Sequence, residues 1–195
     1  QIDRIIVGSA TPTDKALKLT AGDELRAAYF LERREMGVIN IGGKGSITLD
    51  GVKYDFDYKD GIYIGMGTKE VIFESVDASN PAKFYFNSAP AHKTYPTKFI
   101  NPERDILPEN KKELGCLENA NHRTIRKYIL PGQVESCQLE MGMTALEPGS
   151  VWNTMPCHTH DRRMEVYLYF EVPENDVVFH YMGEPTETRH IVMRN

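Results

Sequence analysis

Long apolar runs are absent from this chain of 195 residues. The two longest uninterrupted runs cover five residues each, at 27–31 and 166–170. A helix that crosses a bilayer needs about 20 apolar residues. The sequence therefore predicts a protein without a membrane-spanning helix.

Cysteine is scarce. Cys116, Cys137 and Cys157 make an odd number and lack the Cys-x-x-Cys spacing that is typical of zinc knuckles. We therefore expect neither a disulfide framework nor a cysteine-based zinc site. A reducing, cytoplasmic compartment fits this usage best.

Positive charge is in deficit, with 23 Lys and Arg against 28 Asp and Glu, a formal net charge of −5. Phosphate binding needs a positive face, so this balance argues against a nucleic-acid partner. Hydrophobic residues make up 41% of the chain and aromatic residues 10%. That content is enough for a folded core and excludes general disorder.

The apolar pattern predicts an all-β protein. Helical periodicity is hard to find, and its best candidate, residues 15–25, is interrupted by Gly22. Asp50-Gly51 lies between alternating apolar residues and predicts a hairpin turn, because both positions can reach positive φ. Residues 51–58 alternate with period two, as a half-buried strand does. Further strands are predicted at 37–41, 46–49, 61–65, 70–74, 83–86, 124–130, 137–141, 166–170, 177–182 and 189–193.

A proline-rich stretch separates two groups of strands. Pro90, Pro96, Pro102 and Pro108 recur with charges between them and no apolar period. We expect a connector over residues 91–121, between an N-terminal domain at 1–90 and a C-terminal domain at 122–195. The chain begins with Gln and ends just after a predicted strand, so we interpret it as a piece of a longer protein whose second domain is incomplete.

The densest group of chemically active side chains follows this connector. His158 and His160 project from the same face if their segment is a strand, and Cys157 then points away from them. A turn over 161–164 would let Glu165 begin a returning strand and face the same interior. Two imidazoles and one carboxylate suit zinc, iron(II) or manganese(II), so we predict a metal site. The alternative is an exposed, polar strand end without a metal.

This His-x-His pattern, with Glu five residues further on in an all-β chain, resembles the first motif of the cupin superfamily. The string from Trp152 to Tyr167, Trp-Asn-Thr-Met-Pro-Cys-His-Thr-His-Asp-Arg-Arg-Met-Glu-Val-Tyr, is more specific and resembles the 5-keto-4-deoxyuronate isomerase family. Further segments similar to that family lie at 2–8, 29–35, 37–43, 89–97 and 187–193. The resemblance covers essentially the whole chain.

The resemblance implies a bicupin, two double-stranded β-helix (jelly-roll) barrels of which the C-terminal one is truncated here, assembled as a homohexamer. It also implies one zinc ion per protomer, held by His158, His160 and Glu165. The family's fourth ligand is a histidine on a later strand, which this sequence does not reach. His180 and His190 are the nearest substitutes.

The N-terminal domain is expected to lack a metal. Residues 29–35, which stand where a metal-binding cupin has its histidines, contain none, and His92 is the first histidine of the chain. Residues 42–45, Gly-Gly-Lys-Gly, lack the Walker spacing and predict a tight turn rather than a phosphate loop.

The implied activity is a metal-dependent aldose–ketose isomerase. It would convert 5-dehydro-4-deoxy-D-glucuronate to 3-deoxy-D-glycero-2,5-hexodiulosonate in pectin and uronate catabolism. Arg163 and Arg189 are candidates to bind the carboxylate of this sugar acid, with Arg162 as a further one. Tyr167 shares strand parity with Glu165 and is a further substrate-binding candidate; no general base is identified. The alternatives are an iron(II) cupin dioxygenase and a non-catalytic uronate-binding cupin.

Overall fold

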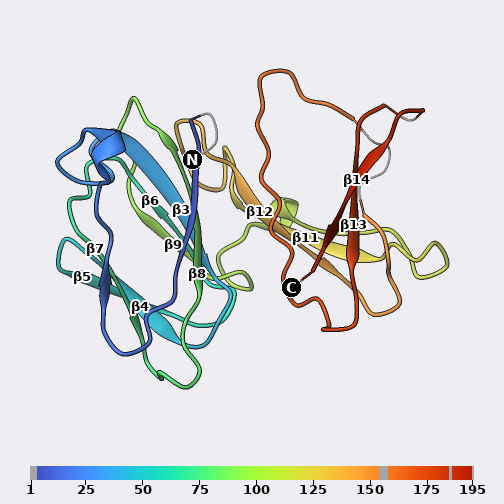
Figure 1. The fold of residues 1–195 in the computed structure, drawn as a ribbon, viewed down its shortest axis with the longest axis horizontal. Helices are drawn as coiled ribbons and strands as arrows, with labels where there is room; N and C mark the ends of the chain where they lie inside the picture. The colour runs from blue at the N-terminus through green and yellow to red at the C-terminus, as the bar shows by residue number, and fades with distance from the viewer. Residues whose placement is uncertain (1–3, 154–157, 185, 195) are drawn as a thin grey trace. The chain divides into compact units, whose positions relative to one another are not determined.

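The computed structural model describes residues 4–153, 158–184 and 186–194 (Figure 1). They belong to two compact units, Gln1–Asn153 and Thr154–Asn195. The predicted all-β class is confirmed, because the only helical pieces of the described chain are two 3-10 turns, η1 (Asp23–Leu25) and η2 (Pro108–Asn110). No helix among these residues is long and apolar enough for a membrane span.

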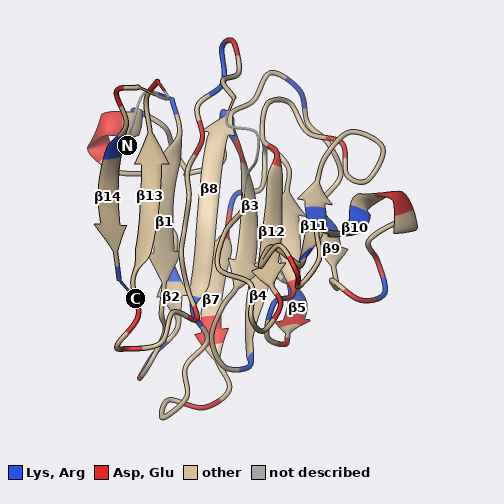
Figure 2. Ribbon diagram, turned by 90° about the vertical axis from the view of Figure 1, so that its right-hand side faces the viewer, with Lys and Arg blue, Asp and Glu red and all other residues tan. Residues whose placement is uncertain are grey.

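The first unit contains two larger antiparallel sheets. The five-stranded sheet has the order β1 (Ile6–Ala10), β8 (Phe84–Pro90), β3 (Arg34–Asn40), β6 (Gly61–Ile64) and β9 (Lys98–Ile100). The four-stranded sheet has the order β2 (Leu17–Lys18), β7 (Val71–Ser75), β4 (Gly45–Leu49) and β5 (Val52–Phe56). The inner strand β8 carries no charged residue, whereas charges of both signs gather in the loops at the strand ends (Figure 2).

One apolar cluster joins these two sheets. Met36 and Val38 of β3 and Ile47 of β4 are all at most 1% exposed and belong to it. The hairpin between β4 and β5 turns at Asp50 and Gly51, whose φ angles of 46° and 86° confirm the predicted turn. Of the residues that alternate over 51–58, Phe56 is buried in this cluster, whereas Val52 and Tyr58 are exposed. The alternation therefore predicts the strand correctly but its buried face only in part.

A third sheet of the first unit has the order β10 (Lys111–Leu114), β11 (Arg123–Ile129) and β12 (Met141–Leu146). The predicted connector, residues 91–121, is thus itself structured, since it supplies β9, η2 and β10. The proposed domain limits stay a prediction.

The strand predicted at 137–141 is wrong. The backbone N–H groups of residues 137–139 donate to the carboxylate of Glu35 instead of to a neighbouring strand.

Gly37 allows β3 to pack closely against residues near the third sheet. A Cβ at this position would lie 2.6 Å from Ile129 Cδ1 and 3.1 Å from both Leu139 Cδ2 and Met141 Sδ. We expect Gly37→Ala to lower the free energy of unfolding by about 1–3 kcal/mol, measured by urea denaturation, because the buried neighbours must shift. Gly22→Ala is the control, since its φ of −70° suits any residue and a Cβ there meets only the end of the exposed Glu24 side chain. A Gly37→Ala protein as stable as the parent would contradict this packing argument.

In the part of the second unit that the structure describes, β13 (Val178–Met182) and β14 (Arg189–Met193) form one antiparallel hairpin. The strand predicted at 166–170 is wrong, since these residues join no ladder. A strand needs a partner for its backbone groups, and none runs beside this segment within the described part of the unit.

Candidate metal and substrate site

A turn brings the predicted ligand segment back on itself. Asp161 and Arg162 form the turn, with Arg162 in the left-handed region at φ 59°. After it, Glu165 Oε1 lies 3.7 Å from His160 Nε2. The turn predicted from the sequence is confirmed, and the carboxylate that follows it lies beside an imidazole, although Glu165 begins no strand.

The two imidazoles are also neighbours. The ring centroids of His158 and His160 lie 4.8 Å apart, with the planes at 89°. Both residues and Glu165 are exposed to solvent and do not lie on strands. The prediction that these side chains face the interior of a barrel from two paired strands is therefore wrong. Cys157, which was expected to point away, lies outside the described residues.

The donor chemistry of this group fits a zinc ion. Ligand atoms about 2.1 Å from a tetrahedral zinc ion are about 3.4 Å apart. The separation of 3.7 Å between His160 and Glu165 is close to that value. Among the residues that the structure describes, no three His, Cys, Asp or Glu side chains lie close enough together to hold a metal ion. The ligand set therefore stays a prediction.

Two tyrosines and a third histidine continue the group. Tyr167 Oη donates a hydrogen bond of 3.3 Å to Glu165 Oε2, and its ring centroid lies 5.0 Å from that of His180. Tyr169 Oη lies 2.6 Å from His180 Nδ1. We call His158, His160, Glu165, Tyr167, Tyr169 and His180 the 158–180 cluster.

Partial burial raises the pKa of the Tyr167 phenol, and the nearby Glu165 carboxylate raises it further. Burial also raises the pKa of Tyr169. Since a phenol ordinarily titrates near pH 10, both hydroxyl groups stay protonated at neutral pH and can act as hydrogen-bond donors.

His180 and His190 differ in position, although the sequence offers both as substitute ligands. Tyr181 pairs with His190 across the hairpin, whereas His180 pairs with Ile191. Residues paired across a sheet share a face and consecutive residues alternate, so the two histidines lie on opposite faces. His190 packs near Phe179 and Tyr181, at centroid distances of 6.1 and 6.3 Å. Only His180 joins the 158–180 cluster.

The arginine candidates occupy exposed positions. Arg163 directly follows the turn at Asp161 and Arg162, whereas Arg189 begins β14 opposite Met182. Arg163 is therefore two residues from Glu165 in the chain. Within the described part of the second unit, no contact joins Arg189 to the 158–180 cluster.

The sequence alone did not assign His180 and Tyr169 to this group. Tyr169 was not among the candidate site residues, and His180 was one of two possible substitutes. The only available signal was the shared parity of Glu165, Tyr167 and Tyr169. The contact with His180 depends on how the chain folds back 11 residues later.

Comparison with known proteins identifies close relatives. A model of the KduI/IolB family matches residues 2–194. Over 195 residues the chain is 71% identical to the 4-deoxy-L-threo-5-hexosulose-uronate ketol-isomerase of Lachnospira eligens, covering 100% of this chain and 70% of the relative. Proteins of the same name from Lachnoclostridium phytofermentans and Escherichia coli are 74% and 55% identical, each over 100% of this chain and 69% of the relative.

A solved structure of an IolB-like protein from Salmonella typhimurium is also similar. The TM-score is 0.50 at 13% sequence identity, and the match covers 69% of this chain and 48% of the other. At this identity the likeness concerns the fold alone.

Proposed function

Because the chain belongs to the KduI/IolB family, we propose that it catalyses the reaction for which its relatives are named, the ketol isomerisation of 4-deoxy-L-threo-5-hexosulose uronate. The family resemblance found in the sequence is confirmed by the match over residues 2–194. The class of enzyme expected from it, a ketol-isomerase, is confirmed by the names of the relatives. Identity above 70% along the whole chain is the observation that supports the proposal most strongly.

The reaction moves two protons and needs no external oxidant or reductant. One proton leaves C2 and is delivered to C1, and the proton of the C2 hydroxyl ends on the C1 oxygen. The aldehyde becomes an alcohol while the neighbouring alcohol becomes a ketone. Negative charge builds on the two oxygens in between, so the site must stabilise that charge.

The 158–180 cluster supplies groups that suit this task. His158, His160 and Glu165 would hold a zinc ion, which when bound polarises the carbonyl and stabilises charge on the substrate oxygens. Tyr167 donates to Glu165 Oε2 and so orients the carboxylate from outside the ligand set. Its phenol is protonated at neutral pH, so it can also donate to a substrate oxygen.

Tyr169 and His180 are placed to relay a proton. Their hydrogen bond of 2.6 Å joins Oη to Nδ1, and it fixes the orientation of the imidazole. Arg163, next to the turn, is the candidate to pair with the substrate carboxylate, because a guanidinium binds a carboxylate through two parallel hydrogen bonds. Arg189 is kept as a second candidate for the same role.

The finer features implied by the resemblance belong to this proposal. They are a bicupin protomer, a homohexamer with one zinc ion per protomer, and 3-deoxy-D-glycero-2,5-hexodiulosonate as product. The names of the relatives favour this function over the iron(II) dioxygenase and the non-catalytic uronate-binding protein.

Removal of the metal tests the proposal. We expect chelation followed by dialysis to lower the isomerisation rate by more than about 100-fold, because the charge on the substrate oxygens loses its main stabilisation. Added zinc should restore the rate. The rate is followed by NMR of the C1 and C2 positions, with oxygen consumption recorded in parallel.

Three outcomes would contradict it. Isomerisation that persists after the metal is shown to be gone overturns the metal dependence. Oxygen consumption with the metal-loaded protein favours the dioxygenase. Binding of the uronate without conversion in the metal-loaded protein favours the non-catalytic binding protein.

A further inference from the structure

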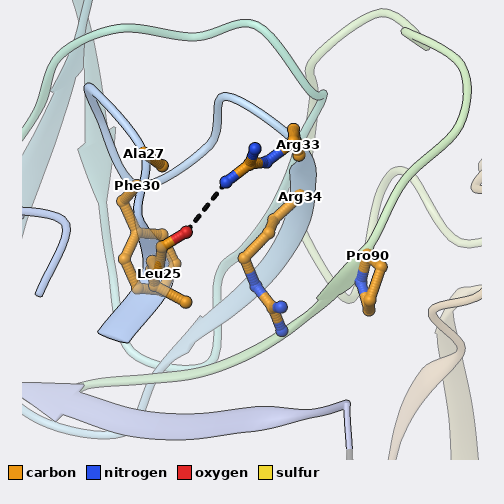
Figure 3. Close-up of a pocket in the computed structure, with 6 residues that line it drawn as sticks. All are labelled: Leu25, Ala27, Phe30, Arg33, Arg34 and Pro90. Carbon is orange, nitrogen blue, oxygen red and sulfur yellow. Dashed lines mark hydrogen bonds between the residues drawn. The ribbon is translucent and has the colours of Figure 1, made fainter. Parts of the chain in front are cut away.

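A pocket of about 280 Å³ lies in the first unit, at the start of β3. It is lined by Leu25, Ala27, Phe30, Arg33, Arg34 and Pro90 (Figure 3). Four of these side chains are apolar, and the other two are guanidinium groups. None of the described residues that line the pocket carries a carboxylate, although the chain as a whole is acidic.

Arg34 is a buried cation that has no acidic partner among the described residues. The residue is only 8% exposed. Its Nε donates to Ser88 Oγ at 3.0 Å, and its Nη2 donates to the carbonyl oxygens of Ser88 and Arg4, each at 2.7 Å. All three acceptors are neutral, and no ion pair of Arg34 occurs within the described chain. Burial lowers the pKa of this guanidinium, but an arginine side chain stays charged at neutral pH. A buried charge of this kind is costly unless an opposite charge accompanies it.

The hydrogen bonds of Arg34 leave one nitrogen available. They use Nε and Nη2, so the two N–H groups of Nη1 have no acceptor among the described residues. The buried side-chain atoms that lack a hydrogen-bond partner do not include Nη1, so this nitrogen is not fully enclosed by the protein. Figure 3 shows the guanidinium between Leu25 and Phe30 on one side and Pro90 on the other. A ligand in the pocket can therefore reach it.

Arg33 adds a second positive charge at the same pocket. Its Nη2 donates to the carbonyl oxygens of Leu25 and Arg26 at 2.8 and 2.9 Å, the first of which is drawn in Figure 3. These bonds hold the loop before β3 and fix the exposed guanidinium against that loop, at the lining of the pocket. Two cations next to an apolar wall attract an anion and leave room for its apolar part.

We propose that this pocket binds a small carboxylate with an apolar body. The carboxylate lies against Nη1 of Arg34, the guanidinium of Arg33 adds positive charge at the same pocket, and the apolar body lies against Phe30 and Pro90. The volume is close to the lower end of small-molecule sites, about 300 Å³. A uronate fits this wall poorly, because its hydroxyl groups would lose water without gaining hydrogen bonds. The site is therefore distinct from the proposed isomerase site, and the inference does not depend on that function.

Titration of the full chain with benzoate tests the proposal, using calorimetry. Benzamide has the same shape without the charge, and galacturonate has the charge without the apolar body. We expect benzoate to bind with a Kd in the millimolar range or below, and both comparison compounds at least about tenfold more weakly. Two results would overturn the proposal. One is the absence of a binding heat when benzoate is present at about ten times a millimolar Kd, and the other is equal affinity for benzamide.

Variants locate the binding in the pocket. Ala27→Phe fills the pocket and keeps both guanidinium groups, whereas Arg34→Gln removes the buried charge. We expect each to weaken benzoate binding by at least about tenfold. Arg26→Gln, which removes an exposed charge outside the pocket, should change Kd by less than about twofold.

Thermal unfolding shows whether each variant is folded. If Arg34→Gln does not fold, Ala27→Phe alone decides the question, because it disturbs no hydrogen bond of Arg34. Unchanged benzoate binding by folded Ala27→Phe would refute the assignment to this pocket.

Discussion

Replacement of His160 by alanine is expected to abolish zinc binding and to lower kcat/KM for uronate isomerisation by more than about 1,000-fold. His160 is the member of the proposed ligand set that contacts both others. Its ring lies next to that of His158, and its Nε2 lies 3.7 Å from Glu165 Oε1. Loss of its imidazole removes one ligand and also the group that links the remaining two. Metal content is measured by mass spectrometry on dialysed protein, and activity by the NMR assay.

His92→Ala is the matched control for this experiment. His92 is exposed in the first unit and lies outside the proposed site, so its removal should leave zinc content and turnover unchanged. His158→Ala and Glu165→Ala should lose the metal as His160→Ala does, while circular dichroism shows that the β structure is kept. Stoichiometric zinc in all three variants would refute the ligand assignment, even if the enzyme class is correct.

Replacement of Glu35 by glutamine is expected to lower the free energy of unfolding by about 3–4 kcal/mol. The Glu35 carboxylate is fully buried and accepts four hydrogen bonds. Oε1 accepts from the backbone N–H groups of Gln138 and Leu139 at 2.7 and 2.8 Å. Oε2 accepts from the N–H of Cys137 at 2.7 Å and from Tyr63 Oη at 2.8 Å. The pKa of Tyr63 is raised well above its usual range, mainly because the phenol is buried and also because it donates a hydrogen bond to Glu35.

The amide of glutamine cannot take over this role. One of its two terminal atoms is an NH₂ group, which would face N–H or O–H donors and leave them without an acceptor inside the protein. Tyr63→Phe removes only one donor and should cost about 1–2 kcal/mol. Glu109→Gln, at an exposed position, should change stability by less than about 0.5 kcal/mol. Urea denaturation gives all three values, and a Glu35→Gln protein that loses less than about 1 kcal/mol would contradict this interpretation.

Local patterns were sufficient to predict most strands. The alternation over 51–58 and the pair Asp50-Gly51 are read from adjacent residues, and both appear in the structure as β5 and its hairpin turn. The failure at 137–141 has a different origin. The backbone there is bound by Glu35, about a hundred residues earlier in the chain, and nothing within the segment itself indicates this.

The candidate site shows the same division. The turn after His160 was predicted from local spacing and is present. The contact of His180 with Tyr169 joins two separate segments. The apolar run at 166–170 resembles a strand, although none of the described residues forms a partner strand for it. Residue type and spacing thus indicate which groups can bind a metal, whereas their orientation depends on neighbours that the spacing does not reveal.

The Glu35 carboxylate also has a consequence for the order of folding. Its bonds to residues 137–139 span 102 to 104 positions of the chain. Closing so long a loop costs chain entropy before any bond is gained, and contacts of large sequence separation slow the folding of a domain. During synthesis, β3 leaves the ribosome well before its partner loop exists. We therefore expect the carboxylate to stay hydrated in early folding species, and the third sheet to pack against the rest of the first unit in a late step.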